Sequence, residues 1–123
     1  MTHPNYVMLY VDNPPASARF YAALLSSDPV ETSPTFALFA LDTGLMLGLW
    51  SKHSVEPAPG AAAGSSEICL KLSDYDAVDT VCADWKQQDI PILLEPKTLD
   101  FGRSFVAQDP DGHRLRAFAL APE

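Results

Sequence analysis

The residue types that most often perform catalysis or bind metals are scarce in this chain of 123 residues. It has three histidines and two cysteines, namely His3, His53, His113, Cys69 and Cys82. A zinc or iron site needs several such ligands together, and nucleophilic catalysis needs a base beside its Ser or Cys. The histidines fall near the N-terminus, at the start of an irregular stretch and in a turn, so we expect surface or turn roles. No Ser-His-Asp or Cys-His arrangement and no phosphate-binding glycine loop is apparent.

The two cysteines are too few for a disulfide framework. Both lie inside apolar runs, so we expect buried, reduced thiols of the kind found in a reducing compartment. No apolar run approaches the ~20 residues of a membrane span. The opening residues Met1–Pro4 lack the basic and apolar regions of a signal peptide. We therefore expect a cytoplasmic protein with no membrane partner.

The composition indicates one folded domain. Apolar residues make up 47% of the chain and charged residues 20%, which is too apolar for a disordered protein. Eleven prolines and six glycines argue against a helical bundle. Sixteen acidic against eight basic residues give a net charge of −8. That charge argues against nucleic acid as a partner and favours a small ligand that carries an amine.

The chain divides into two halves of similar plan. In the first half Asn13 and two prolines open a helix between strands. In the second half Ser73 and the acids after it open another. The expected strands are 6–11, 30–32, 35–41 and 45–51, then 66–72, 91–97, 103–108 and 113–120, and the expected helices are 14–25 and 73–88. This is a βαβββ order repeated, with module 1 at about 5–52, a loop at 53–65 and module 2 at about 66–121, within one domain at 1–123.

Strand alternation separates two faces in each half. One face is aliphatic throughout, which suits packing under the helices. The other mixes aromatic, thioether and charged side chains, as a ligand-lining surface does. A dimer interface or a secondary core fits the same pattern. Our candidate ligand-binding residues on this face are Tyr6, Met8, Met46, Gly48, Trp50, Glu67, Arg116 and Phe118. Alternation does not assign Phe36, Phe39 or Phe105 to a face.

Two segments of the chain resemble the vicinal oxygen chelate superfamily, which includes glyoxalase I, bleomycin-resistance proteins and extradiol dioxygenases. They are Phe101-Gly102-Arg103 through Asp109-Pro110-Asp111-Gly112-His113 to Arg116, and Tyr10-Val11-Asp12-Asn13 with Ala16 to Tyr21. The resemblance implies an α+β fold in which the two modules form an incurved eight-stranded mixed sheet. The helices would cover its outer face, and the sheet would enclose a cleft.

The resemblance also implies where a metal would bind in the enzymes of this superfamily. The four ligand positions correspond to Tyr6, Gly48, Glu67 and Arg116. Of these only Glu67 is a suitable ligand, because Gly48 has no side chain and Arg116 is cationic. We therefore predict no catalytic metal and no cofactor. We also predict that Glu67 and Arg116 form a bidentate ion pair in the place of the metal.

Within the superfamily the chain looks most like the phenazine-antibiotic resistance type. The matching segments are Leu49-Trp50-Ser51, Ser66-Glu67-Ile68, Asp84-Trp85-Lys86 and Phe101-Gly102-Arg103. The resemblance implies a homodimer with clefts at the subunit interface that binds and sequesters a planar aromatic drug, phenazine-like or bleomycin-like, without catalysis. Trp50 would stack on the ring, and Gly48 would leave space for it. The alternatives are a divalent-metal-dependent enzyme of the glyoxalase or dioxygenase kind and a module that binds a protein partner.

Overall fold

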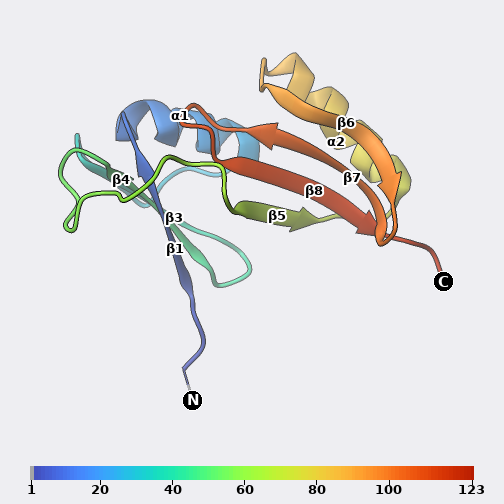
Figure 1. The fold of residues 1–123 in the computed structure, drawn as a ribbon, viewed down its shortest axis with the longest axis horizontal. Helices are drawn as coiled ribbons and strands as arrows, with labels where there is room; N and C mark the ends of the chain where they lie inside the picture. Colours follow the sequence, from blue (N-terminus) through green and yellow to red (C-terminus); the bar gives the residue numbers. More distant parts are fainter. Residues whose placement is uncertain (1) are drawn as a thin grey trace. The chain divides into compact units, whose positions relative to one another are not determined.

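A computed structural model describes residues 2–123 of the chain. The fold divides into two compact units, of which the first ends at Ala62 and the second begins at Ala63. Each unit is one βαβββ module with its own four-stranded sheet (Figure 1). In the described part of the chain no helix is both long and apolar enough to cross a membrane.

Module 1 is a mixed sheet with one helix. Its elements are β1 (Tyr6–Val11), α1 (Pro14–Leu25), β2 (Glu31–Thr32), β3 (Phe36–Ala40) and β4 (Met46–Ser51). The strand order is β1-β4-β3-β2, with β1 parallel to β4 and the other neighbours antiparallel. The Asn13 side chain accepts a hydrogen bond from the Ala16 backbone N–H, which confirms the predicted helix start.

Module 2 repeats this plan. Its elements are β5 (Glu67–Lys71), α2 (Tyr75–Gln87), β6 (Ile92–Leu99), β7 (Gly102–Gln108) and β8 (Arg114–Leu120). The strand order is β5-β8-β7-β6, so the proline-containing strand β6 lies at the edge, where a missing backbone N–H is tolerated. The helix cap is Asp74 and not Ser73. The Asp74 carboxylate is the side chain that accepts from the Ala77 backbone N–H.

The repeat extends to the pairing of individual residues. In the parallel pairs Tyr6 lies opposite Met46, and Glu67 lies opposite Arg114. Gly48 is the third residue of β4, and Arg116 is the third residue of β8. The two residues therefore occupy equivalent positions in the two modules. The turns before β4 and β8 each contain a glycine with positive φ, at Gly44 and Gly112. The predicted α+β class with two βαβββ modules is confirmed, with the eight strands in two four-stranded mixed sheets.

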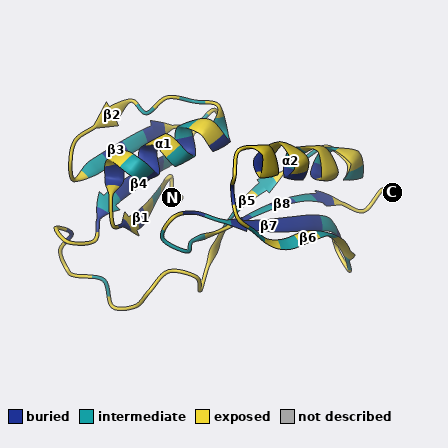
Figure 2. Cartoon of the chain, turned by 90° about the horizontal axis from the view of Figure 1, so that it is seen from above, coloured by how far each residue is buried: buried dark blue, intermediate teal, exposed yellow. Residues whose placement is uncertain are grey.

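Each helix packs against one face of the sheet in its own module, and the core lies between them (Figure 2). In module 1 Tyr21 of α1 and Phe39 of β3 are fully buried in this layer. The buried side of α1 contains Tyr21 and Leu24, whereas Phe20 is only partly buried. The opposite face of each sheet carries no helix of the same module. We call it the open face.

Module 2 has its own aromatic core. Trp85 of α2 and Phe105 of β7 meet edge to face, with ring centroids 5.1 Å apart. Both side chains are buried, and Phe105 is fully so. The structure thus assigns Phe39 and Phe105 to the core, while Phe36 joins Trp50 on the open face of module 1.

Candidate functional site

The open face of module 1 exposes a row of large apolar side chains. Tyr6, Met8 and Tyr10 of β1 are 52%, 39% and 39% exposed. The strand pairing sets them opposite Met46, Gly48 and Trp50 of β4 respectively. All five predicted residues of this module therefore share one face, and Tyr10 joins them although the sequence analysis did not select it.

Met8 occupies the space above Gly48. A Cβ atom on Gly48 would lie 2.3 Å from the Met8 sulfur and 3.0 Å from its methyl carbon. Gly48 therefore permits a close approach by a neighbouring side chain, and the space predicted for a ring holds the Met8 thioether. A methionine has three rotatable bonds, so this thioether can move aside. Beside it the rings of Phe36 and Trp50 meet edge to face at 6.3 Å.

The open face of module 2 has a hollow with a volume of about 480 Å³. We call it the β5–β8 hollow. Its lining residues are Glu67, Cys69, Leu99, Phe101, Arg116, Phe118 and Leu120. The walls are mainly apolar, and the rings of Phe101 and Phe118 meet edge to face at 6.0 Å. A few polar groups among apolar walls are typical of a small-molecule site.

Gly102 brings the Phe101 ring to the hollow. Its φ is +151°, and a Cβ atom there would lie 2.1 Å from the backbone oxygen of Ala119. Only glycine allows β7 to begin this close to β8. The Phe101 carbonyl also accepts a hydrogen bond from the Ala121 N–H. The sequence analysis used Phe101 and Gly102 only as part of a resemblance and did not identify Phe101, Leu99 or Leu120 as lining residues.

Glu67 and Arg116 are in contact, as predicted. The Arg116 Nε donates to Glu67 Oε1 at 2.7 Å. The predicted bidentate geometry is wrong, because Arg116 Nη1 donates to the buried Ser104 hydroxyl at 2.9 Å. Glu67 of β5 pairs directly with Arg114 of β8, and Arg116 lies two residues farther along β8. The ion pair therefore runs diagonally between the two strands. Ser104 thus holds the guanidinium in place, a role that the sequence analysis missed.

Cys69 lies on this face and lines the hollow. The sequence analysis placed both cysteines in the interior, and this was right for Cys82 and wrong for Cys69, which is exposed. Strand alternation explains the difference, since Cys69 has the same parity as Glu67 and Lys71. The Cys69 Sγ lies 3.6 Å from Glu67 Oε1.

These contacts set the protonation states in the hollow. The hydrogen bond from Arg116 lowers the pKa of the Glu67 carboxyl, with further contributions from the Arg116 charge, Cys69 and Arg114. Partial desolvation raises the pKa of the Cys69 thiol, and the neighbouring Glu67 charge raises it further. At neutral pH the hollow therefore holds a carboxylate and a protonated thiol. Neither is a strong base or nucleophile, so the arrangement suits binding better than acid–base chemistry.

The histidines lie in turns and at the surface, as predicted. His53 Nε2 and Asp12 Oδ1 are 2.7 Å apart and exposed. His113 contacts the buried Asp109 carboxylate, which also accepts from the backbone N–H groups of Asp111 and His113. Ligand atoms of these three residues lie within 4.8 Å of one another. Those hydrogen bonds give Asp109 a structural role in closing the turn before β8.

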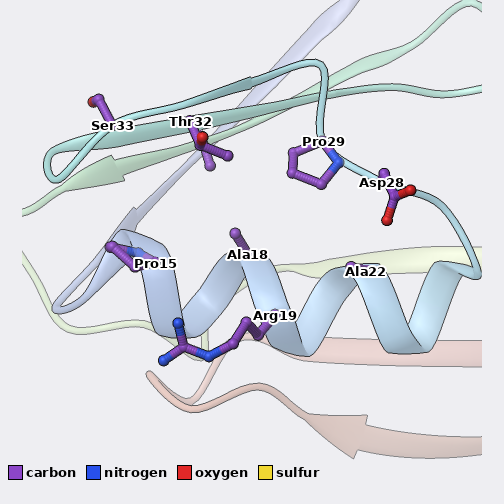
Figure 3. Close-up of a pocket in the computed structure, with 9 residues that line it drawn as sticks. Pro15, Ala18, Arg19, Ala22, Asp28, Pro29, Thr32 and Ser33 are labelled. Atoms are coloured by element: carbon purple, nitrogen blue, oxygen red, sulfur yellow. The ribbon is translucent and has the colours of Figure 1, made fainter.

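A second hollow, of about 430 Å³, lies on the helix side of module 1 (Figure 3). It is formed by α1 and the segment from Asp28 to Ser33, and small side chains such as Ala18 and Ala22 face it. Arg19 extends along α1, and Asp28 stands on the facing segment. None of the predicted site residues lines this hollow.

The Glu67–Arg116 pair predicts a specific pH dependence of stability. The folded pKa of Glu67 lies below its ordinary value of 4.5, so the pair stabilises the fold above that pH and ceases to do so as the pH falls through the folded value. We expect the difference in unfolding free energy between the wild type and Glu67→Gln to stay constant from about pH 7 to pH 5.5 and to shrink below about pH 4.5. Urea unfolding at each pH measures it.

Arg116→Gln provides the control. Without the guanidinium the folded and unfolded pKa values of Glu67 converge, so this variant combined with Glu67→Gln should show little acid dependence from that residue. An unchanged acid dependence in the Arg116→Gln background would contradict the assignment of the pKa shift to this contact.

Comparison with known proteins connects these features to relatives. The phenazine antibiotic resistance protein EhpR of Enterobacter agglomerans is 32% identical over 120 residues, which cover 95% of this chain and 92% of that protein. A solution structure of a protein from Agrobacterium tumefaciens is 48% identical, with a TM-score of 0.87 and coverage of 99% of this chain and 100% of the other.

A more distant structure shows how widely the fold is shared. The crystal structure of a glyoxalase/bleomycin resistance protein/dioxygenase from Nocardioides has a TM-score of 0.85 at 21% identity, covering 98% of this chain and 84% of that one. The model of the family matches residues 3–117, nearly the whole chain. The protein described here therefore belongs to the glyoxalase/bleomycin resistance protein/dioxygenase superfamily.

Proposed function

We propose that this protein binds a planar aromatic small molecule and protects the cell by sequestering it without chemical change. The observation that carries the proposal is the apolar, aromatic character of both open faces. On module 1 Tyr6, Met8 and Tyr10 remain substantially exposed. On module 2 the β5–β8 hollow has aromatic walls and a single ion pair. The relationship to a phenazine resistance protein supports the same class of ligand.

The apolar groups on these faces fit a flat ring system. Trp50 offers an indole face on the same sheet face as the Met8 thioether, and Phe101 and Phe118 present ring edges and faces in the hollow. Burial of aromatic surface contributes roughly 25 cal/mol per Å², and aromatic pairs add about 0.5–1.5 kcal/mol each. The proposed ligand contacts are those of the sequence analysis, considered module by module. They are Tyr6, Met8, Met46, Gly48 and Trp50 on module 1, and Glu67, Arg116 and Phe118 on module 2, with Phe101 added there.

The chemistry of the predicted metal position favours binding over metal-dependent catalysis. A divalent ion beside Glu67 would meet the Arg116 guanidinium, which already donates to that carboxylate. Like charges at such a distance repel strongly where solvent is partly excluded. The alternative considered in the sequence analysis, a divalent-metal-dependent enzyme, would need that ion. A near-stoichiometric divalent ion that survives dialysis of the purified protein would therefore favour the enzyme over the binding protein.

The two tryptophans allow a direct test. Trp50 lies on the open face, whereas Trp85 is 4% exposed and belongs to the core. In Trp85→Phe, where Trp50 is the remaining fluorophore, titration with phenazine-1-carboxylate should quench the fluorescence. In Trp50→Phe the quenching should nearly vanish while calorimetry still detects binding. Trp50→Ala should weaken binding about tenfold, because base-like rings gain about 1–3 kcal/mol from aromatic stacking.

The outcomes separate cleanly. Binding without turnover, detected as unchanged ligand on chromatography after incubation, supports sequestration. Failure of phenazines and other planar aromatic drugs to bind by calorimetry at millimolar concentration would overturn the proposal. A homodimer with a cytoplasmic location belongs to the same proposal, and sedimentation with and without ligand measures the oligomeric state.

A further inference from the structure

The charged residues of this acidic chain are unevenly distributed over its surface. The chain carries eight basic and sixteen acidic residues, for a net charge of −8. The pairing of β5, β8, β7 and β6 identifies which strand residues share the open face of module 2, since directly paired residues point to the same side. The charged residues among them are Lys71, Lys97, Arg114, Arg116 and Glu67.

Four of the eight basic residues of the chain therefore lie on the open face of module 2. The strands of this face contribute one acidic residue to it, Glu67. Four cations against one carboxylate give this face a net charge of +3 in a protein that is otherwise strongly acidic. Asp100 lies outside the strands, in the turn between β6 and β7, and counting it still leaves +2. The helix side differs, since its cations Lys86 and Arg103 are paired with Glu95 and Asp79.

The open-face cations other than Arg116 form no ion pair in the described part of the chain, although the Arg114 charge acts on Glu67. Lys71, Lys97 and Arg114 are exposed, and none forms an ion pair with a described acid. Lys71 lies opposite Phe118, and Arg114 lies opposite Glu67, so both border the β5–β8 hollow. Lys97 lies opposite Ser104, the hydroxyl that holds Arg116. These three cations thus share the open face with the aromatic hollow, although none of them is among its lining residues.

The ion pair inside the hollow also retains free donors. Arg116 uses Nε for Glu67 and Nη1 for Ser104, and its Nη2 has no hydrogen-bond partner among the described residues. A guanidinium nitrogen with unused N–H groups favours a carboxylate or another anionic oxygen. Glu67 is neutralised by its contact with Arg116, so it opposes an anion less than a free carboxylate would.

We propose that the β5–β8 hollow selects anionic planar aromatic ligands, in which a carboxylate or phenolate on the ring faces the cations of the open face. This inference rests on the proposed function and specifies its ligand class. It reverses the amine preference that the net charge of the chain predicts, because a ligand responds to the potential of its own site and not to the sum over the molecule. In this proposal the aromatic walls bind the ring, and the cations of the open face favour an anionic substituent over a neutral or cationic one.

One scaffold with three substituents tests this inference. Calorimetry compares phenazine-1-carboxylate, phenazine-1-carboxamide and the cationic N-methylphenazinium at low salt. We expect the carboxylate to bind about tenfold more tightly than the carboxamide and the cation to bind weakest. The carboxylate preference should fall as ionic strength rises, since the cations that border the hollow are exposed.

Charge-removing variants locate the effect. Arg114→Gln and Lys71→Gln should each reduce the carboxylate preference about two- to fourfold while leaving carboxamide affinity unchanged. Arg19→Gln on α1 removes an exposed cation that forms no ion pair with a described acid, with the same change in net charge, and it should leave the preference intact.

The failures are distinguishable. If none of the three phenazines binds, the proposed function fails. If all bind but the carboxamide or the cation is preferred, the function stands and this inference is overturned. A second result would also overturn the inference. If Arg19→Gln abolishes the carboxylate preference while Arg114→Gln and Lys71→Gln retain it, the anionic group binds on the helix side of module 1.

Discussion

Arg116→Glu should nearly abolish ligand binding and create a divalent-metal site that we expect the wild type not to have. The substitution removes the guanidinium that binds Glu67 and Ser104 and sets a second carboxylate beside the first. A ligand that accepted a hydrogen bond from the guanidinium would lose about 1.5–3 kcal/mol of binding free energy, which corresponds to at least about tenfold in affinity. Reversal of the charge adds to this loss. We expect phenazine-1-carboxylate to bind roughly a hundredfold more weakly by calorimetry.

The gain of metal binding follows from the same geometry. The two carboxylates and the Cys69 thiol, 3.6 Å from Glu67 Oε1 in the wild type, would provide oxygen and sulfur donors of the kind that zinc prefers. Zinc titration with a chromophoric chelator should show a site in Arg116→Glu that is lost again when Cys69→Ser is added.

Arg116→Gln separates the two effects. This variant removes the cation without adding a carboxylate, so ligand affinity should fall by a smaller factor and zinc affinity should stay low. Stoichiometric zinc in the wild type that requires Glu67 would contradict the idea that Arg116 takes the place of the metal. Circular dichroism of each variant confirms that the fold is intact.

The fold was largely predictable because its signals are local and repeated. The β1 strand at Tyr6–Val11 and the α1 helix at Pro14–Leu25 match the expected ranges, since an apolar strand followed by Asn and two prolines leaves little choice of structure. The repeat of one plan in the two halves also extends to single positions, because Gly48 and Arg116 are equivalent in the two modules. The identical register in the two parallel pairs bears this out.

The site was only partly predictable, because alternation gives the face of a residue but not its neighbours across strands. It correctly grouped Glu67 with Arg116, yet it could not reveal that Ser104 of β7 takes one of the guanidinium N–H groups. The role of Gly102 was equally hidden. The approach of its backbone to Ala119 is a tertiary contact that no pattern in the sequence records.

The local charge of the candidate site was also not predictable from the sequence. The net value of −8 is a property of the whole chain, whereas the open face of module 2 collects basic residues from β5, β6 and β8. Those residues are up to 45 positions apart, from Lys71 to Arg116, and only the strand order brings them together. A prediction of ligand charge therefore requires the register of the sheet and cannot be made from composition.

Phe105→Ala should destabilise the protein by about 3–5 kcal/mol, the largest effect on stability that we expect from a single substitution. The Phe105 ring is fully buried and packs edge to face on Trp85 at 5.1 Å. Its removal deletes apolar burial and leaves a cavity that α2 and β7 cannot close without moving. Urea unfolding in a Trp50→Phe background, with Trp85 fluorescence as the reporter inside module 2, measures the loss.

Phe118→Ala is the matched control, and it tests the meaning of the open face. Phe118 lies on β8, directly opposite Ser104 in the neighbouring strand, so the two phenylalanines point to opposite sides of one sheet. If the open face is a ligand surface, Phe118→Ala should cost less than about 1 kcal/mol without ligand and should weaken ligand binding. If it costs as much as Phe105→Ala, the open face is a second core covered in the folded protein. The aromatic side chains there would then stabilise the fold and would not be available to a drug.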